Sequence, residues 1–99
     1  MKSYKIMILS SAKEDLAGII DYLSSFYENT AANQYDRIIE KINRLKQFPF
    51  MYPEYESSIS NYNYRKMVVD NYLVFYTVSE DTVRIHNIIN GKMDIGNII

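Results

Sequence analysis

Residues 64–95 read YRKMVVDNYLVFYTVSEDTVRIHNIINGKMDI, and this stretch decides the fold. It is rich in Val, Ile, Tyr, Phe and Thr, which suit the pleated, half-buried surface of a sheet. We expect it to form three strands, Tyr64–Val69, Tyr72–Val78 and Thr82–Ile89. Two polar turns would join them, Asp70-Asn71 and Ser79-Glu80-Asp81, and Asn71 tolerates the positive φ that a two-residue hairpin needs.

The middle strand of the three is apolar on both faces. Its alternating residues are Tyr72, Val74, Tyr76 and Val78 on one side and Leu73 and Phe75 on the other. Such a strand belongs in the interior of a sheet that is covered above and below. The sequence therefore raises the question of whether this chain covers both faces or a partner covers one.

Two amphipathic segments precede these strands. A short apolar strand, Tyr4–Leu9, comes first, and Ser11 with Glu14 has the capping-box spacing, so we expect a helix with Ser11 as N-cap. Thr30 is the expected N-cap of a second helix, which Pro49 ends. Each segment carries one apolar stripe at helical spacing, and the short break between them predicts an antiparallel hairpin. The hairpin should therefore pack on one face of the sheet.

The remaining segment, Phe50–Asn63, reads FMYPEYESSISNYN and is expected to be irregular, because it holds a proline and a Ser/Asn cluster. The predicted order is β-α-α-β-β-β in one domain, residues 1–99. This is an α+β fold with an antiparallel sheet and a helical hairpin packed on one face.

Composition excludes several functional classes. The 99 residues are 47% hydrophobic and 23% charged, as in a globular chain, with a net charge of −1 that argues against a mainly electrostatic nucleic-acid binder. The chain has no Cys and a single His, so we expect no zinc site, and a cytoplasmic location is favoured over a secreted one. The chain has no Gly-rich phosphate loop, so we expect no cofactor. It also has no apolar run long enough for a membrane span.

The polar residues of the strands are the remaining candidates for chemistry. Adjacent residues on a strand point to opposite faces, so only one of Arg65 and Lys66 can face a shared pocket. Arg84 and His86 are two apart and share a face, where a cation and an imidazole suit a phosphate-contacting site. The alternative, that these are ordinary solvated strand residues, stays open.

The end of the chain, Asn90–Ile99, is expected to be a functional or partner-contacting tail outside the core. Gly91 and Gly96 lower its tendency to stay regular, and the apolar pair Ile98-Ile99 needs a surface to cover it. Packing of this tail against the helix pair is the alternative.

Short motifs follow one another along nearly the whole chain. They are Ala12-x-x-Asp15-Leu16-x-x-Ile19-x-x-Tyr22, Ile42-x-x-Leu45-x-x-Phe48-Pro49, Tyr64-Arg65-Lys66, and Asn71-Tyr72-Leu73-Val74-Phe75-Tyr76. The stretch from Ile85 to Ile95 then resembles a family ending, RVLHGRRDI. In this order and spacing the chain resembles the RelE/ParE superfamily of bacterial toxins, and the fold of that superfamily agrees with the order read from the strands and helices.

The chain departs from the RNA-cutting branch of that superfamily. Where that branch has an arginine after the tyrosine of the middle strand, and another shortly after the glycine, this chain has Leu73 and Met93. Its C-terminal aromatic residue would fall near Ile99. The Tyr-Leu-x-Phe-Tyr run is more similar to the ParE branch, whose better-known members poison DNA gyrase.

The ParE-like ending is altered as well. Asn87, Asn90 and Lys92-Met93 replace its arginine, its histidine and its arginine pair, while Gly91 and Asp94 remain. A weakened, retargeted or inactive toxin therefore stays open.

The resemblance implies the toxin component of a type II toxin–antitoxin system, neutralised by a cognate antitoxin whose C-terminal segment wraps the domain. Homodimers, or heterotetramers with the antitoxin, are the expected assemblies. DNA gyrase or another replication protein is the expected target, without enzymatic activity. The alternatives are a ribosome-dependent mRNA endoribonuclease, a catalytically inactive toxin-fold module, and a self-sufficient binding domain without an antitoxin.

The candidate residues fall into two groups. Catalytic candidates are Arg65, Lys66, Arg84, His86 and Lys92. Candidate target- or partner-binding residues are Tyr64, Arg65, Asn87, Asn90, Lys92, Asp94, Ile98 and Ile99.

Overall fold

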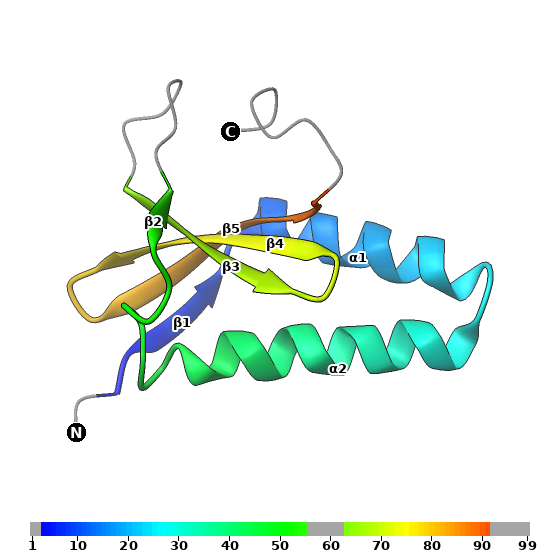
Figure 1. The fold of residues 1–99 in the computed structure, drawn as a ribbon, viewed down its shortest axis with the longest axis horizontal. Coiled ribbons are helices and arrows are strands. Elements are labelled where there is room, and N and C mark those ends of the chain that lie inside the picture. Colours follow the sequence, from blue (N-terminus) through cyan, green and yellow to red (C-terminus); the bar gives the residue numbers. More distant parts are fainter. Residues whose placement is uncertain (1–2, 56–62, 92–99) are drawn as a thin grey trace.

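The computed structural model describes residues 3–55 and 63–91 of the chain. Its elements in order are β1 (Lys5–Ile8), α1 (Ser10–Ser24), α2 (Glu28–Arg44), β2 (Glu54–Tyr55), β3 (Tyr64–Val69), β4 (Tyr72–Ser79) and β5 (Thr82–Asn90). The strands form one sheet in the order β1-β5-β4-β3-β2, and the two helices run side by side as a hairpin against it (Figure 1). The predicted α+β class is confirmed.

Two details of the sheet differ from expectation. β1 pairs with β5 in parallel, from Lys5 opposite Thr82 to Ile8 opposite Ile85, so the sheet is mixed rather than wholly antiparallel. The helical hairpin between the first and later strands lets the chain return in the same direction, which a tight turn does not allow. The segment expected to be irregular contributes β2, whose two residues pair with the start of β3.

Both strand hairpins have the predicted position, but the first differs in its backbone, and the second turn is shorter than predicted because Ser79 belongs to β4. The positive φ values fall at Asp70 (55°) and Glu80 (57°), so Asp70 rather than Asn71 takes the left-handed conformation. Asp, like Asn, visits this region more readily than most other residues with a side chain. Each hairpin has a two-residue loop, closed by the pairs Val69–Tyr72 and Ser79–Thr82.

The helix starts were predicted wrongly. α1 begins at Ser10 after Leu9, and α2 begins at Glu28 after Tyr27, with no side-chain cap bond at either start. Ser11 lies inside α1, and its hydroxyl donates to the carbonyl of His86 on β5 at 2.6 Å. The hydroxyl that the pattern assigned to capping is therefore used by the neighbouring strand.

The helix face of the sheet carries the main core. Ala12 and Leu16 of α1 and Ile38 and Ile42 of α2 are buried in it. The strands contribute Met67, Val69, Tyr72, Val74, Tyr76, Val83, Ile85 and Ile88. Tyr76 is fully buried, its hydroxyl donates to the Pro49 carbonyl at 2.8 Å, and burial raises its pKa to about 12. The phenol thus stays neutral and satisfied inside an apolar core.

The opposite face, which we call the open face, has a smaller cluster of its own. Tyr64, Phe75 and Ile89 are buried there, with Tyr55 and Leu73 packed against them. β4 is therefore buried on both faces, as its sequence predicted.

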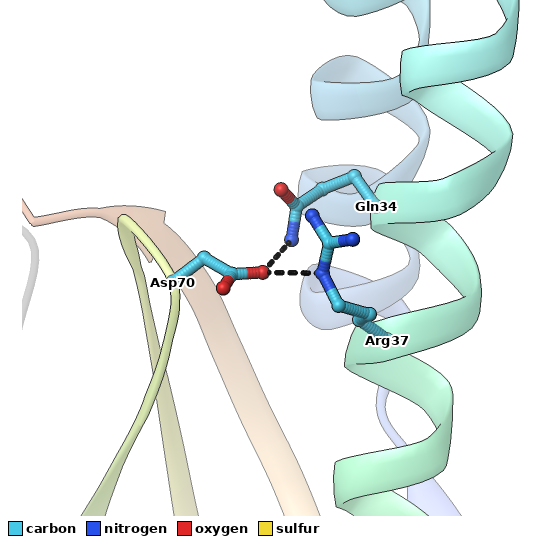
Figure 2. A network of polar contacts seen from close by, with 3 residues as sticks. All are labelled: Gln34, Arg37 and Asp70. Atoms are coloured by element: carbon cyan, nitrogen blue, oxygen red, sulfur yellow. Dashed lines mark hydrogen bonds and ion pairs between the residues drawn. The ribbon is translucent and has the colours of Figure 1, made fainter.

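A polar link ties the β3–β4 hairpin to α2. Asp70 accepts hydrogen bonds from Gln34 at 3.1 Å and from Arg37 at 2.7 Å, both at the same carboxylate oxygen (Figure 2). These bonds, with the hydrogen bond from Arg37 as the larger cause, hold the pKa of Asp70 below its usual value. The link connects the hairpin to α2 at a position where both charged side chains remain substantially exposed.

Candidate functional site

The open face brings together the polar side chains of β4 and β5. Thr77 lies opposite Arg84 in the antiparallel register, so a hydroxyl and a guanidinium share this face. Phe75 of the same strand opposes Asn87, and Tyr76 opposes Ile85, which leaves His86 as an extra residue on β5. Bulges of this kind re-aim side chains and often occur beside active sites.

His86 is held on three sides. Its Nε2 lies 2.9 Å from the hydroxyl of Thr77, its ring packs edge-on to Tyr64 with centroids 5.1 Å apart, and its carbonyl accepts from Ser11. Burial, followed by the nearby charge of Arg84, lowers the pKa of His86. A neutral imidazole at pH 7 is the result, with one ring nitrogen able to donate and the other to accept.

A cavity of ≈ 550 Å³ opens beside this histidine. Its lining residues are Leu9, Asn63, Thr77, Val78, Ser79, Arg84 and His86. The predicted shared face of Arg84 and His86 is therefore confirmed, and the two side chains line one cavity.

Arg65 and Lys66 point to opposite faces, as predicted. The Arg65 guanidinium donates to the Tyr52 carbonyl at 2.6 Å, lies 3.5 Å from Glu54 and sits 5.0 Å from the Phe50 ring centroid. These contacts tie β3 to the preceding segment. Lys66 places its ammonium 5.5 Å from the ring centroid of Tyr55. Neither residue lines the cavity at His86.

The other candidates are distributed more widely. Tyr64 is buried, so its ring supports His86 rather than forming an exposed contact surface. Asn87 reaches Asp15 of α1 at 3.4 Å, and the same carboxylate accepts from the backbone N–H of Ile88 at 2.9 Å. Asn90 is the last residue of β5 and pairs with Tyr72.

The expected tail therefore begins too early at Asn90, because that residue belongs to the sheet. Gly91 follows it and donates to the Asn71 carbonyl at 2.8 Å, and a Cβ on Gly91 would lie 3.3 Å from that oxygen. A larger residue would crowd this turn. Lys92, Asp94, Ile98 and Ile99 lie outside the described residues.

The helices carry a second hollow, here called the helix groove, of ≈ 500 Å³. Its lining residues are Ile8, Lys13, Leu16, Ala17, Ile20, Asp21, Tyr35 and Ile39. Near the turn that joins the helices, Tyr22, Phe26 and Tyr27 are exposed, and this turn projects beyond the β3–β4 hairpin (Figure 1). Neither helix is long and apolar enough to cross a membrane, within the part of the chain that the structure describes.

Sequence reasoning missed Thr77, Ser79 and Asn63 as cavity residues, and Asp15 as the partner of β5. Alternation along β4 was the available signal for Thr77 and Ser79, since both follow Phe75 at steps of two. The helix groove had no comparable signal, because it depends on how two helices and a strand approach one another.

Comparison with known proteins assigns the chain to a family. A family model described as ParE toxin of type II toxin-antitoxin system, parDE, matches residues 6–95. A chain of the solved structure "Chromosomal ParDE TA system from P. aeruginosa" shares the fold, with a TM-score of 0.75 and 16% identity over 91% of this chain and 98% of that chain. No curated protein sequence matches. The RelE/ParE resemblance is thereby confirmed, and the chain belongs to the ParE toxin family as a toxin of a type II toxin–antitoxin system.

Proposed function

We propose that this toxin inhibits DNA gyrase or another replication protein by contact, without cutting RNA. The observation that carries this choice is the setting of Leu73, which packs in the open-face cluster beside the fully buried Phe75. The RNA-cutting branch has an arginine at this place. Loss of one positioned charge-stabilising group typically costs ~10²–10³ in the rate of cleavage. An arginine in place of Leu73 would also put an unpaired charge among apolar side chains, which costs free energy.

Ribosome-dependent mRNA cleavage is the second candidate. Its favouring observation is the cavity where Arg84, His86 and Thr77 meet, because RNA cleavage needs a cation on the phosphate and a proton-transfer group. A toxin-fold module without activity is the third reading, and it rests on the altered ending at Asn87 and Asn90.

Induction of the toxin in growing cells distinguishes these targets. Inhibition of gyrase should produce a DNA-damage response while mRNA stays intact and translation continues during the first minutes. Rapid loss of protein synthesis with fragmented mRNA would reverse the ranking. Normal growth at a level of folded toxin that saturates its antitoxin would support the inactive module.

We further propose that the helix groove receives an amphipathic helix of the cognate antitoxin. Leu16, Ile20 and Ile39 give the groove apolar walls, and Lys13 and Asp21 at its lining offer one charge of each sign to polar side chains of a partner. A helix with apolar residues at i, i+3, i+4 and i+7 fits such a groove. The exposed aromatics Tyr22, Phe26 and Tyr27 extend the surface available to the antitoxin.

Ile20→Asp tests this docking site, with the small protein of the neighbouring reading frame as the partner. A carboxylate in the apolar groove should weaken binding roughly tenfold or more, because it would be buried without a partner. Val68→Asp is the matched control, since Val68 is exposed on β3 and does not line the groove. Unchanged binding by a folded Ile20→Asp variant would refute the groove as the antitoxin site.

The remaining expectations belong to the same proposal. Residues 1–99 would form one toxin domain in the cytoplasm, assembling as a homodimer or as a heterotetramer with the antitoxin. The contacts to the target or partner would come from Arg65, Asn87, Asn90, Lys92, Asp94, Ile98 and Ile99. No cofactor is needed for inhibition by contact.

A further inference from the structure

The cavity on the open face has a chemically distinct lining. Its cationic member is Arg84, and Ser79 and Asn63 add groups that can donate hydrogen bonds. Thr77 and the neutral His86 are bonded to each other, so this pair has one further donor for a ligand. No carboxylate lines it among the described residues. We propose that this cavity binds the phosphate group of a nucleotide, with Arg84 and His86 contacting the phosphate oxygens. The inference goes beyond the proposed inhibition by contact. It concerns the same cavity that the mRNA-cleavage candidate would use, but it requires binding only and no cleavage.

Arg84 is the first reason for this assignment. A guanidinium presents several N–H donors in a plane and matches phosphate oxygens in a bidentate way. Arg84 lies directly opposite Thr77 in the β4–β5 register, and both residues line the cavity. Arg84 is half-buried, and partial exclusion of water strengthens a charge-assisted bond relative to a fully exposed one.

His86 is the second reason, because its position is fixed before any ligand arrives. His86 lies two residues after Arg84 and so shares the open face with it, Thr77 and Tyr64 hold its ring, and Ser11 holds its carbonyl. A donor whose orientation is already set binds with less loss of side-chain entropy. Arg84 and His86 are also distinct from Leu73 and Met93, the two places where the RNA-cutting branch has arginine.

The size and walls of the cavity favour a nucleotide over a bare phosphate ion. Its ≈ 550 Å³ falls among the roughly 300–1,000 Å³ typical of small-molecule pockets. Leu9 gives it an apolar wall suited to a sugar or a base, beside the polar end formed by Arg84. A phosphate ion alone would leave this wall without contact.

The test uses the full chain and four probes: 5′-AMP, adenosine, inorganic phosphate and a 5′-phosphorylated trinucleotide. Binding is measured by calorimetry and by chemical-shift changes at Arg84, Thr77 and the His86 ring. We expect 5′-AMP to bind more tightly than adenosine and more tightly than phosphate. Tighter binding of the trinucleotide than of 5′-AMP would assign the phosphate to a nucleic-acid strand, and equal or weaker binding would assign it to a free nucleotide.

Substitutions make the assignment specific to the cavity. Arg84→Ala should weaken 5′-AMP binding by roughly tenfold or more, as loss of a charge-assisted bond predicts, and Arg84→Lys should weaken it less. Arg44→Ala is the matched control, because Arg44 is an exposed arginine of α2 that pairs with Glu40 away from the cavity. Thermal unfolding checks that each variant is folded. If Arg84→Ala does not fold, Arg84→Lys still tests the proposal. Equal binding of adenosine and 5′-AMP, equal binding of phosphate and 5′-AMP, no binding of any probe, or an equal loss in Arg44→Ala would each overturn the proposal.

Discussion

The two faces of the sheet differ in how they use the same strands. On the helix face, side chains from two helices and four strands form one apolar core, whose central residues are fully buried. On the open face, a small aromatic cluster around Phe75 covers one part, and a polar cavity at His86 occupies another. The helix face thus supplies most of the burial that stabilises the fold, which leaves the open face able to hold polar groups.

The largest expected loss of stability is that of Ile38→Ala, since Ile38 is 0% exposed in the helix-face core. Removing its buried methyl and methylene groups should lower the free energy of unfolding by about 2–5 kcal/mol. Leu73→Ala removes a similar volume from the open face, where Leu73 is only half-buried. The free energy of unfolding should therefore fall clearly less than in Ile38→Ala. Urea denaturation measures both. An equal or larger loss in Leu73→Ala would contradict the unequal roles of the two faces.

A second test concerns the edge of β5 beyond the end of β1, where α1 replaces the missing strand. Asp15 accepts from the N–H of Ile88 there, so Asp15→Ala should cost about 1–3 kcal/mol, the range for a buried donor left unsatisfied. Asp15→Asn keeps an acceptor and should cost less. Asp21→Ala, at an exposed position of the same helix, is the control for loss of a helical carboxylate. Equal unfolding free energies for Asp15→Ala and Asp21→Ala would show that this edge contact adds nothing.

These contacts also indicate what the sequence could and could not predict. The three strands of the second half were predicted to within a residue or two, because alternating β-branched and aromatic residues and short polar turns determine them locally. The pairing of β1 with β5 and the use of Ser11 by His86 depend on segments more than 70 residues apart. A capping pattern such as Ser11 to Glu14 contains no information about a strand that approaches the helix.

In the candidate site as well, local sequence predicted some features, while others depend on distant segments. Arg84 and His86 were placed on one face by their spacing, and the cavity confirms this. The bulge was not predicted, although its trace is in the sequence: Val83 and Ile85 are two apart, whereas Ile85 and the next residue of the main core, Ile88, are three apart. Such a break in a period of two is typical of an inserted residue. The cavity itself requires Leu9 and Asn63 from outside the hairpin, which no local pattern brings together.

The third test uses the lowered pKa of His86 and addresses the open face alone. The folded imidazole binds a proton less readily than the unfolded one, whose pKa is about 6.5. The unfolded state therefore binds more protons below that pH, so stability is complete above it and declines as pH falls through and below 6.5. Thermal unfolding at several pH values from 8 to 5 measures this decline. His86→Gln should reduce it, and an unchanged decline in that variant would assign the effect to another group.

The smallest expected effect concerns the link that ties the strand hairpin to α2. Asp70→Asn removes the ion pair with Arg37, while the amide oxygen can still accept from Gln34, and Asn tolerates the left-handed backbone at this position. The lowered pKa of Asp70 means that its stabilising contribution is present above pH 3.8 and is lost as pH falls below that value. The thermal midpoint of Asp70→Asn should thus lie slightly below that of the wild type at pH 7, with the gap closing at pH 2–3. High salt at pH 7 should narrow the gap as well, because both partners are substantially exposed. A gap of the same size at both pH values would mean that the link acts through the shape of the turn, and the hairpin would then be held by the apolar contacts of the helix face rather than by this charge.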